Sequence, residues 1–350
     1  MSSLHLVRRF LFAATAAGMA VAVAACGSSS GGGPSSATLA ASATNGGKLT
    51  KVSVQAFPQT LGDIPIQVAQ QQGFFKKNGL DVTLTPGAAG PAMIAAVASG
   101  QVDAVGIPMP VGLQSLKAGA NVRAAVGLIG GGGSVVFVSS RVPATTAPYP
   151  ASAKGLQGRT VAISAPGGFS DRMLRYFLGK AGVSANYATL PGVAPETAAM
   201  QAGRVDAVNF DLASSYKLQK QGLGRILWDF QTTGPSDLRG VSTNELWVSS
   251  SFATQHPQEA QALAKSIAQA DAWIKSNQSQ AAKYFTQVAG SPVTGPALAA
   301  MVNAMDPVVG TKDIQAYTPL LGGNPPATSD VVASSAPQDP AAAQTLAGGA

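Results

Sequence analysis

The 350-residue sequence predicts an α/β protein built from two similar lobes that are joined by two crossover strands. Short apolar strands alternate with helical segments along most of the chain, which is typical of βαβ units and of largely parallel sheets. The stretch GQVDAV at 100–105 nearly recurs as GRVDAV at 203–208, and each copy follows a similar apolar helix. The chain therefore begins the same kind of strand twice, once in each predicted lobe.

The first 25 residues are predicted to be a signal peptide. A basic start precedes an uncharged apolar run at 10–25, which is short for a membrane-spanning helix. The run ends in VAAC, the small-small-cysteine pattern of a bacterial lipobox. We expect Cys26 to carry acyl chains that hold the protein on a membrane, and residues 26–48 to form a flexible tether. The alternative for Cys26 is a buried free thiol.

The composition limits what else the chain can be. Cys26 is the only cysteine, so no disulfide can form within the chain and its core must stabilise the fold. The formal net charge is +7, and removal of the two arginines in residues 1–25 lowers it to +5. Lys and Arg are scattered without a basic run, which argues against a nucleic-acid partner. The mild positive charge favours an anionic ligand or an anionic membrane surface.

The first lobe is predicted to follow the tether. KVSVQAF at 51–57 alternates and is rich in β-branched residues, so it predicts a strand. IPIQVAQQQGFFKKNG at 64–79 has apolar residues at helical spacing and a final glycine, so it predicts a helix. The next expected elements are a strand at 81–86, a helix at 91–99, a strand at 102–107, a helix at 110–119 and a strand at 121–129.

The extended segments SVVFVSS at 134–140 and ELWVSS at 245–250 are the two predicted crossovers. After the second, Pro257 opens a long helical stretch, and its apolar residues from Ala260 to Ile274 predict a packing face rather than a cofactor site. Between the crossovers we expect strands at 159–164, 185–191, 203–210 and 224–230, and helices at 172–182, 195–202 and 212–222.

These elements divide the chain into lobes. Residues 49–135 and 248–333 are assigned to lobe 1 and residues 136–247 to lobe 2, while residues 334–350 have the composition of a flexible tail. Two lobes joined by two strands enclose a cleft, and small ligands favour such clefts. Closure about a hinge is then the expected motion.

The sequence offers little for catalysis. Beyond the signal segment His256 is the only histidine, so a histidine metal cluster or a Ser-His-Asp triad would depend on this one residue. No zinc-ligand spacing, nucleophile elbow, P-loop or dinucleotide motif is present. Asp103 and Asp206 resemble a carboxylate pair, but at strand starts we expect each to order its own turn. The sequence favours a binding protein without metal or cofactor.

In each lobe a strand runs into a short glycine-containing loop and then a helix. The loops are TPGAAGPAM at 85–93 and SAPGGFSDRM at 164–173. Free N–H groups at a helix start attract anions, and glycine lets a ligand approach the backbone closely. An ordinary βα turn explains either loop alone, but two such loops at matching places favour a shared binding site.

The chain resembles the substrate-binding proteins that serve ABC importers of nitrate, sulfonate and taurine, a group that includes thiamine-precursor binding proteins. IPIQVAQQQGFFKKNGLDVTL, GPAMIAAVASGQVDAVGI and PETAAMQAGRVDAVNFD carry the resemblance, which covers about 51–287. It implies a type II periplasmic-binding fold in which each lobe is a mixed sheet flanked by helices. It also implies a monomer at the outer face of the membrane that delivers solute to a permease and its ATPase.

The resemblance implies ligand contacts from two loops of the first lobe, namely Phe57, Pro58 and Gln59, and Gly87, Ala88 and Ala89. Relatives often have Ser or Thr in the second of these loops, and its two alanines favour a more apolar ligand. The other candidates in the cleft are Ile107, Pro108, Gly167, Gly168, Phe169, Ser170, Asn209 and Asp211.

Several of these side chains allow two interpretations. Phe57, Phe169 and Phe210 either sandwich a flat or aliphatic ligand or belong to the core. Asp211 either binds an amine or ring N–H group or caps a helix. Arg172 either pairs with an acidic ligand or faces solvent.

The leading hypothesis is a lipid-anchored binding protein for import of a small organic solute, anionic and similar to sulfonate, nitrate or carboxylate. The alternatives are a binder of a pyrimidine or thiamine-precursor ligand, a sensor without a transport role, and an enzyme on the same fold. Some relatives in thiamine-pyrimidine synthesis use a histidine and a cysteine-rich segment, and this chain lacks the latter.

Overall fold

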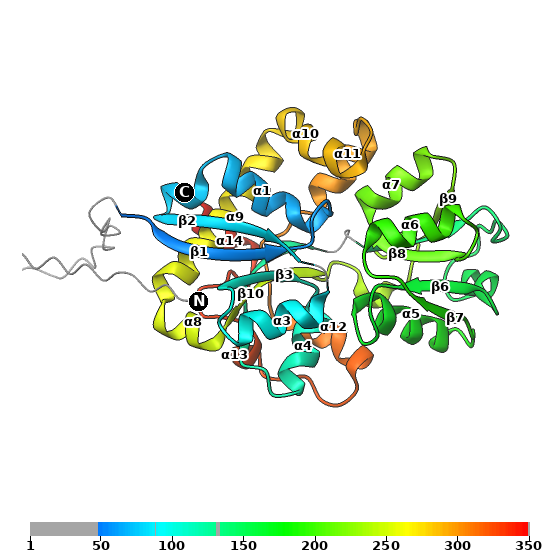
Figure 1. Cartoon of the computed structure of the whole chain (residues 1–350), viewed down its shortest axis with the longest axis horizontal. Helices are drawn as coiled ribbons and strands as arrows, with labels where there is room; N and C mark the ends of the chain where they lie inside the picture. The colour runs from blue at the N-terminus through cyan, green and yellow to red at the C-terminus, as the bar shows by residue number, and fades with distance from the viewer. Residues whose placement is uncertain (1–47, 88, 131–133, 349–350) are drawn as a thin grey trace, which may run out of the picture. The chain divides into compact units, whose positions relative to one another are not determined.

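The computed structural model describes residues 48–87, 89–130 and 134–348 and contains two five-stranded mixed sheets flanked by helices (Figure 1). The predicted α/β fold with two lobes is confirmed. The predicted signal peptide, the predicted lipidation site Cys26, nearly all of the predicted tether, and Ala88 lie outside the described residues. Within the described ranges, no helix is both long enough and apolar enough to cross a membrane.

The first sheet has the strand order β2-β1-β3-β10-β4. Strand β1 is parallel to β2 and β3, whereas β10 is antiparallel to β3 and β4. The strands are β1 (Thr50–Ala56), β2 (Leu80–Pro86), β3 (Ala104–Ile107), β4 (Val122–Ile129) and β10 (Asn244–Ser249).

The second sheet repeats this arrangement with the order β7-β6-β8-β5-β9. Strand β6 is parallel to β7 and β8, and β5 is antiparallel to β8 and β9. Its strands are β5 (Ser134–Ser139), β6 (Thr160–Ile163), β7 (Asn186–Thr189), β8 (Ala207–Asp211) and β9 (Gly224–Asp229).

The two predicted crossover segments become the antiparallel strands of the two sheets. After β4 the chain leaves the first sheet, and β5 inserts between β8 and β9 of the second sheet. After β9 it returns, and β10 inserts between β3 and β4. Residues 244–247 therefore belong to the first lobe, which corrects the predicted lobe boundary at 248.

Most of the helices belong to the first lobe. They are η1 (Leu61–Asp63), α1 (Ile64–Gln71), α2 (Phe74–Lys77), α3 (Gly90–Ala98), α4 (Met109–Lys117), α8 (Ser250–Gln255), α9 (Pro257–Ser276), α10 (Gln278–Ala289), α11 (Gly295–Asn303), α12 (Thr311–Leu321), α13 (Thr328–Val331) and α14 (Pro340–Ala347). The second lobe has η2 (Ala151–Leu156), α5 (Phe169–Lys180), α6 (Val193–Gln201), α7 (Leu212–Lys220) and η3 (Ser236–Leu238).

Two predicted helices are each interrupted once along their length. The helix expected at 64–79 is interrupted at Gly73, whose φ of 74° lies in the left-handed region that glycine tolerates. The long helix expected after Pro257 is interrupted at Asn277, which ends α9 and precedes α10. The apolar periodicity runs through both breaks, so periodicity alone does not reveal them.

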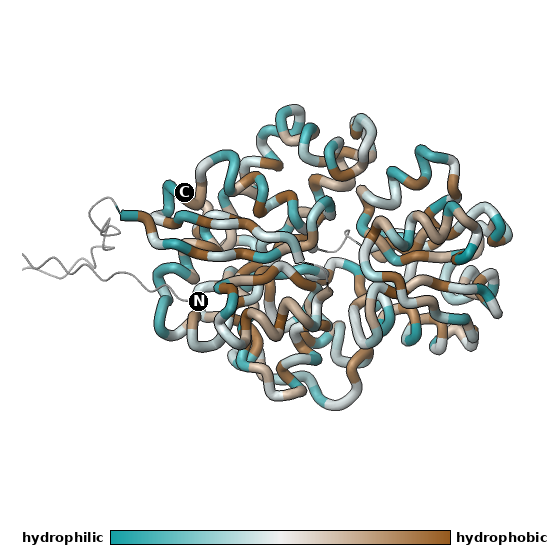
Figure 2. The backbone as a smooth tube through the Cα atoms, in the orientation of Figure 1, coloured by the Kyte–Doolittle hydropathy of each residue, from teal (hydrophilic) through white to brown (hydrophobic). Residues whose placement is uncertain are grey.

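Hydrophobic residues concentrate along the strands (Figure 2), and one face of the first sheet packs against α1 and α9. The predicted packing face of α9 is confirmed, because Ala260, Leu263, Ile267 and Ile274 are all buried. Each fully buried Leu or Ile side chain contributes about 1.5–3 kcal/mol to folding. A second cluster joins α3 and α4 of the first lobe to α5 of the second, so the core continues across the lobe boundary.

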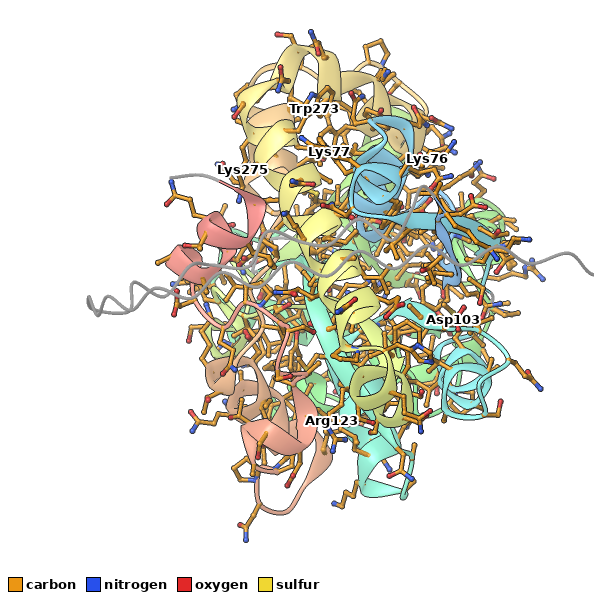
Figure 3. All side chains as sticks on the ribbon, turned by 90° about the vertical axis from the view of Figure 1, so that its left-hand side faces the viewer. Lys76, Lys77, Asp103, Arg123, Trp273 and Lys275 are labelled. Carbon is orange, nitrogen blue, oxygen red and sulfur yellow. The ribbon has the colours of Figure 1, made fainter. Side chains whose placement is uncertain are left out.

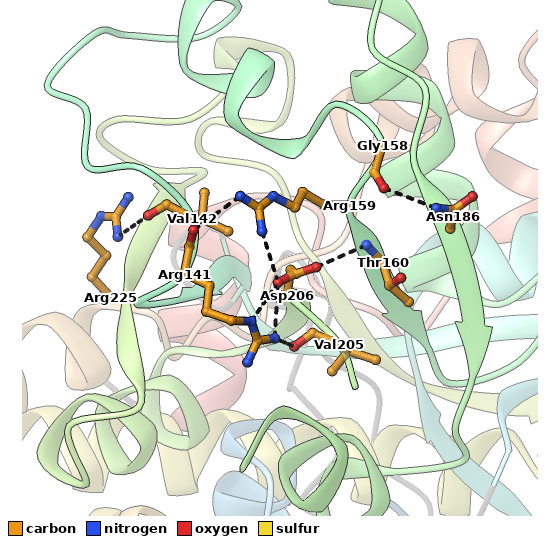
Figure 4. Close-up of polar contacts among 9 residues, drawn as sticks. All are labelled: Arg141, Val142, Gly158, Arg159, Thr160, Asn186, Val205, Asp206 and Arg225. Atoms are coloured by element: carbon orange, nitrogen blue, oxygen red, sulfur yellow. Dashed lines mark hydrogen bonds and ion pairs between the residues drawn. The ribbon is translucent and has the colours of Figure 1, made fainter. Parts of the chain in front are cut away.

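Asp103 and Asp206, the aspartates of the repeated stretches GQVDAV and GRVDAV, each form hydrogen bonds to a neighbouring strand. Oδ2 of Asp103 accepts hydrogen bonds from the Ser53 amide and hydroxyl, each at 2.7 Å, on the end of the first lobe shown in Figure 3. Oδ2 of Asp206 accepts from the Thr160 amide at 3.2 Å, and its carboxylate pairs with Arg141 at 3.0 Å (Figure 4). Each therefore has a structural role, but it binds the adjacent parallel strand rather than its own turn, and Asp206 also binds Arg141, which follows β5.

The segment after Ser334 differs from the flexible tail that its composition predicts. Its helix α14 packs along α9, and Asp339 caps α14 by accepting a hydrogen bond from Ala342 N at 2.8 Å. The chain before α14 is also held, because Val309 N donates to Pro337 O at 3.0 Å. Small residues such as alanine let two helices approach closely, so a composition poor in large apolar residues still allows packing.

A pair of glycine substitutions tests this packing. Gly112 in α4 lies against Trp247, and an added Cβ would overlap the indole ring. We expect Gly112→Ala to lower the free energy of unfolding by about 1–3 kcal/mol, because overpacking displaces a buried ring. Gly179 in α5 has open space around it, so Gly179→Ala should raise stability by about 0.5–1 kcal/mol. Urea unfolding of both variants measures the difference in their stabilities. Equal unfolding midpoints would contradict the close packing of Gly112 against Trp247.

Candidate functional site

A cavity of about 610 Å³ lies between the lobes, where the carboxyl ends of the parallel strands and the following helix starts meet. Ligands in α/β proteins bind at this edge of a sheet, and the volume lies in the range of small-molecule sites. Eleven of the predicted site residues line the cavity: Phe57, Pro58, Gln59, Gly87, Ala89, Pro108, Gly168, Phe169, Ser170, Asn209 and Asp211.

Two predicted site residues lie elsewhere. Ile107 is fully buried in the core, because side chains alternate along β3 and only Pro108, after the strand, reaches the cavity. Gly167 forms the turn of its loop with a φ of 72°, and its amide donates to Oδ2 of Asp171 at 2.8 Å. The Arg172 Nε group donates to the Gly167 carbonyl at 2.9 Å, so this arginine holds the loop and does not line the cavity.

The loop after β1 has an unusual backbone. Gln59 has a φ of 56°, in the left-handed region that a non-glycine side chain occupies at a cost of order 1 kcal/mol. Thr60 supports this turn, because its hydroxyl donates to the Phe57 carbonyl at 3.0 Å. The strain places the exposed Gln59 side chain at the wall of the cavity.

Asp211 joins the two lobes beside the cavity. Its Oδ1 accepts from Ser214 N at 2.7 Å and caps α7, while its Oδ2 accepts from Leu61 N of the first lobe at 2.8 Å. Burial raises the pKa of this carboxyl, and the hydrogen bonds oppose the rise. Both oxygens are occupied, so the capping interpretation fits better than a bond to a ligand amine. Ala213, two residues after Asp211, packs into the core of the first lobe.

The apolar side chains of the cavity come from both lobes. Phe57, Phe169 and Phe210 all line it, and Phe210 is also part of the core of the second lobe. The Phe169 ring meets the edge of Tyr317 from α12, with ring centroids 6.4 Å apart. All three rings therefore pack against or within the core and also line the cavity, and their role in sandwiching a ligand stays a prediction.

Sequence reasoning did not identify Lys217. Among the described residues that line the cavity it is the only cation, and Asp211 is the only acid. No ion pair of Lys217 occurs among the described residues. The aliphatic part of the Lys217 side chain packs closely against Gly290. A Cβ atom added to Gly290 would lie only 3.2 Å from Lys217 Cε. Nothing in its helical surroundings distinguishes Lys217 from Lys220, the other lysine of α7.

A buried acid beside the cavity was also not predicted. Glu196 in the first turn of α6 has no exposed surface, and Ser164 Oγ donates to its Oε1 at 2.8 Å. Ser164 itself lines the cavity. Burial raises the pKa of Glu196 to about 8, while the bond from Ser164 lowers it. In the described ranges, no three His, Cys, Asp or Glu side chains gather in a way that could hold a metal ion.

The family model described as NMT1-like matches residues 45–289, which is well over half of the chain. The chain belongs to the NMT1-like family. A search of curated proteins gives no match. The family segment contains both sheets and all cavity-lining residues, so the candidate site lies within the part of the chain that carries the family likeness.

Solved structures share the fold of this NMT1-like protein. The alkanesulfonate-binding protein of Xanthomonas axonopodis pv. citri bound to MOPS is 19% identical, with 82% of this chain and 97% of that chain covered and a TM-score of 0.63. The periplasmic aliphatic sulphonate binding protein of Escherichia coli is 21% identical, with 76% of this chain and 88% of that chain covered and a TM-score of 0.59. The periplasmic nitrate-binding protein of Synechocystis PCC 6803 is 17% identical, with 68% of this chain and 66% of that chain covered and a TM-score of 0.55.

The bond between the lobes can be tested separately from the helix cap. Asn in place of Asp211 still caps α7 through its oxygen, but it presents N–H groups to Leu61 N instead of an acceptor. A buried donor left without a partner costs about 1–3 kcal/mol, so Asp211→Asn should favour separation of the lobes. We expect a larger radius of gyration for the ligand-free variant in small-angle X-ray scattering.

The matched control is Asp339→Asn, because Asp339 caps α14 in the same way and is exposed. This variant should keep the scattering curve of the unchanged protein. An unchanged radius of gyration for Asp211→Asn would show that the bond to Leu61 does not hold the lobes together.

Proposed function

We propose that the protein is the solute-binding component of an ABC importer and captures a small organic anion between its lobes. The observation that carries this proposal is the cavity itself, which has one lysine without an ion-pair partner among the described residues and largely apolar walls contributed by both lobes. Membership of the NMT1-like family supports it, as do the names of the compared structures, which are sulfonate- and nitrate-binding proteins.

The chemistry of the walls favours a particular kind of anion. Phe57, Phe169 and Phe210 offer rings to a flat or aliphatic body, and Lys217 offers one charge to an acidic group. A cavity of about 610 Å³ is far larger than nitrate needs. An aryl or alkyl sulfonate or carboxylate is therefore the proposed ligand class.

The same proposal includes the attachment and partners expected from the sequence. Cys26 would carry the lipid, and the residues between it and the first described residue, Lys48, would let the lobes reach a permease beside the anchor. The permease and its ATPase are the proposed partners, and the binding protein acts as a monomer.

Isothermal titration of the full chain in lipid nanodiscs tests the ligand class. The compounds are benzenesulfonate, hexanesulfonate, benzoate, nitrate and an aminopyrimidine related to thiamine. We expect the aryl and alkyl anions to bind and nitrate to bind far more weakly, because nitrate leaves the apolar walls uncovered. Tight binding of the aminopyrimidine alone would favour the thiamine-precursor alternative, and no binding by a folded protein would refute the proposal.

Lys217 provides a sharper test. We expect Lys217→Met to weaken benzenesulfonate binding by about 10- to 100-fold, since a hydrogen bond to a charged group contributes about 1.5–3 kcal/mol. Lys220→Met is the control on the same helix, because Lys220 is exposed, does not line the cavity and lies over Tyr216 at 5.2 Å. Equal affinities for the two variants would exclude Lys217 as the anion partner.

A further inference from the structure

Glu196 lies directly behind the wall of the cavity. The neighbouring residues Val193, Ala194, Thr197 and Ala198 of α6 line the cavity, whereas the Glu196 side chain turns into the second lobe. One carboxyl oxygen contacts Ser164 Oγ at 2.8 Å, and the other, Oε2, is buried and has no hydrogen-bond partner among the described residues.

No charged side chain among the described residues compensates this buried acid. The titratable groups on the elements around it have other partners: Asp171 binds Arg175, Arg172 holds the Gly167 carbonyl, Asp206 pairs with Arg141, and Asp211 caps α7. The pKa of Glu196 is raised by burial and lowered only by the bond from Ser164. With a pKa of about 8, the carboxyl holds its proton at neutral pH.

The protonation state of Glu196 decides whether Glu196 or Ser164 donates the hydrogen bond between them. Ser164 Oγ donates to Oε1 when the carboxyl is ionised, but a proton on the carboxyl reverses this bond. Because Oε2 has no partner among the described residues, the favourable arrangement of the acid places the proton on Oε1, where it donates to Ser164 Oγ. The Ser164 hydroxyl hydrogen is then free to face the cavity. Once Glu196 ionises, the carboxylate accepts the hydroxyl hydrogen, and Ser164 can no longer donate it to a ligand.

We propose that Ser164 donates a hydrogen bond to an acceptor oxygen of the bound anion, and that protonated Glu196 is the positioning residue that makes it a donor. This inference rests on the proposed function and names a second polar contact for its ligand. The backbone of Ser164 is fixed for this role, because its amide donates to Ser170 Oγ at 3.1 Å. Ionised Glu196 would also place a negative charge beside an anionic ligand.

Titration calorimetry with benzenesulfonate at pH 6.5 and 9.5 tests the proposal on the full chain in nanodiscs. The sulfonate stays ionised over this pH range, so any change in affinity arises from titration of groups in the protein. Binding favours protonated Glu196, so affinity should fall as the pH rises through about 8, by about tenfold or more. Glu196→Gln should remove this fall, because its amide N–H donates to Ser164 and cannot ionise.

The matched control is Asp271→Asn. Asp271 of α9 is also a buried acid, with a pKa raised to about 6 by burial, but it pairs with Lys275 at 3.0 Å and does not line the cavity. This variant should keep the full pH dependence. A fall in affinity that persists in Glu196→Gln, or that disappears in Asp271→Asn, would overturn the assignment.

Ser164→Ala provides an independent variant, with thermal unfolding to confirm that each protein is folded. Ser164 is half-buried, so this change keeps the test valid even if Glu196→Gln does not fold. We expect weaker binding than the unchanged protein at pH 6.5 and little further loss at pH 9.5. Unchanged affinity at pH 6.5 would overturn the proposal while the proposed function stands, whereas no benzenesulfonate binding at either pH would overturn both.

Discussion

The carboxylate of Asp211 holds the two sides of the cavity in one arrangement. It ends a strand of the second sheet, caps α7 and accepts the Leu61 amide of the first lobe, so one side chain fixes a helix and a lobe contact together. Because α7 also carries Lys217, the position of the cation in the cavity depends on this bond. Burial makes the bond strong and makes the loss of either partner costly.

The sequence predicts most of the framework because strand starts and loop glycines are local signals. The strands after both VDAV stretches, the loops that line the cavity and the packing face of α9 are all present. The division of helices at Gly73 and Asn277 is missed because apolar spacing continues through both positions. Ile107 was misplaced by one residue, since adjacent strand residues point to opposite faces.

The polar residues of the site were harder to predict for a different reason. Lys217 and Glu196 have ordinary helical surroundings in the sequence, and their character comes from what the other lobe or the sheet places beside them. A lysine is notable only when no acid lies near it, and a glutamate only when water is excluded. Both conditions are properties of the tertiary fold and leave no local pattern in the chain.

The insertion of β10 between β3 and β4 sets an order in which the protein can assemble. All five strands of the second sheet lie within residues 134–229, so that sheet is complete as soon as this stretch has emerged. The first sheet must wait for residues 244–249, and until then β3 and β4 lack the strand that joins them. The lobe that begins first along the chain is thus finished last, and its unpaired strand edges are the most exposed to aggregation during synthesis.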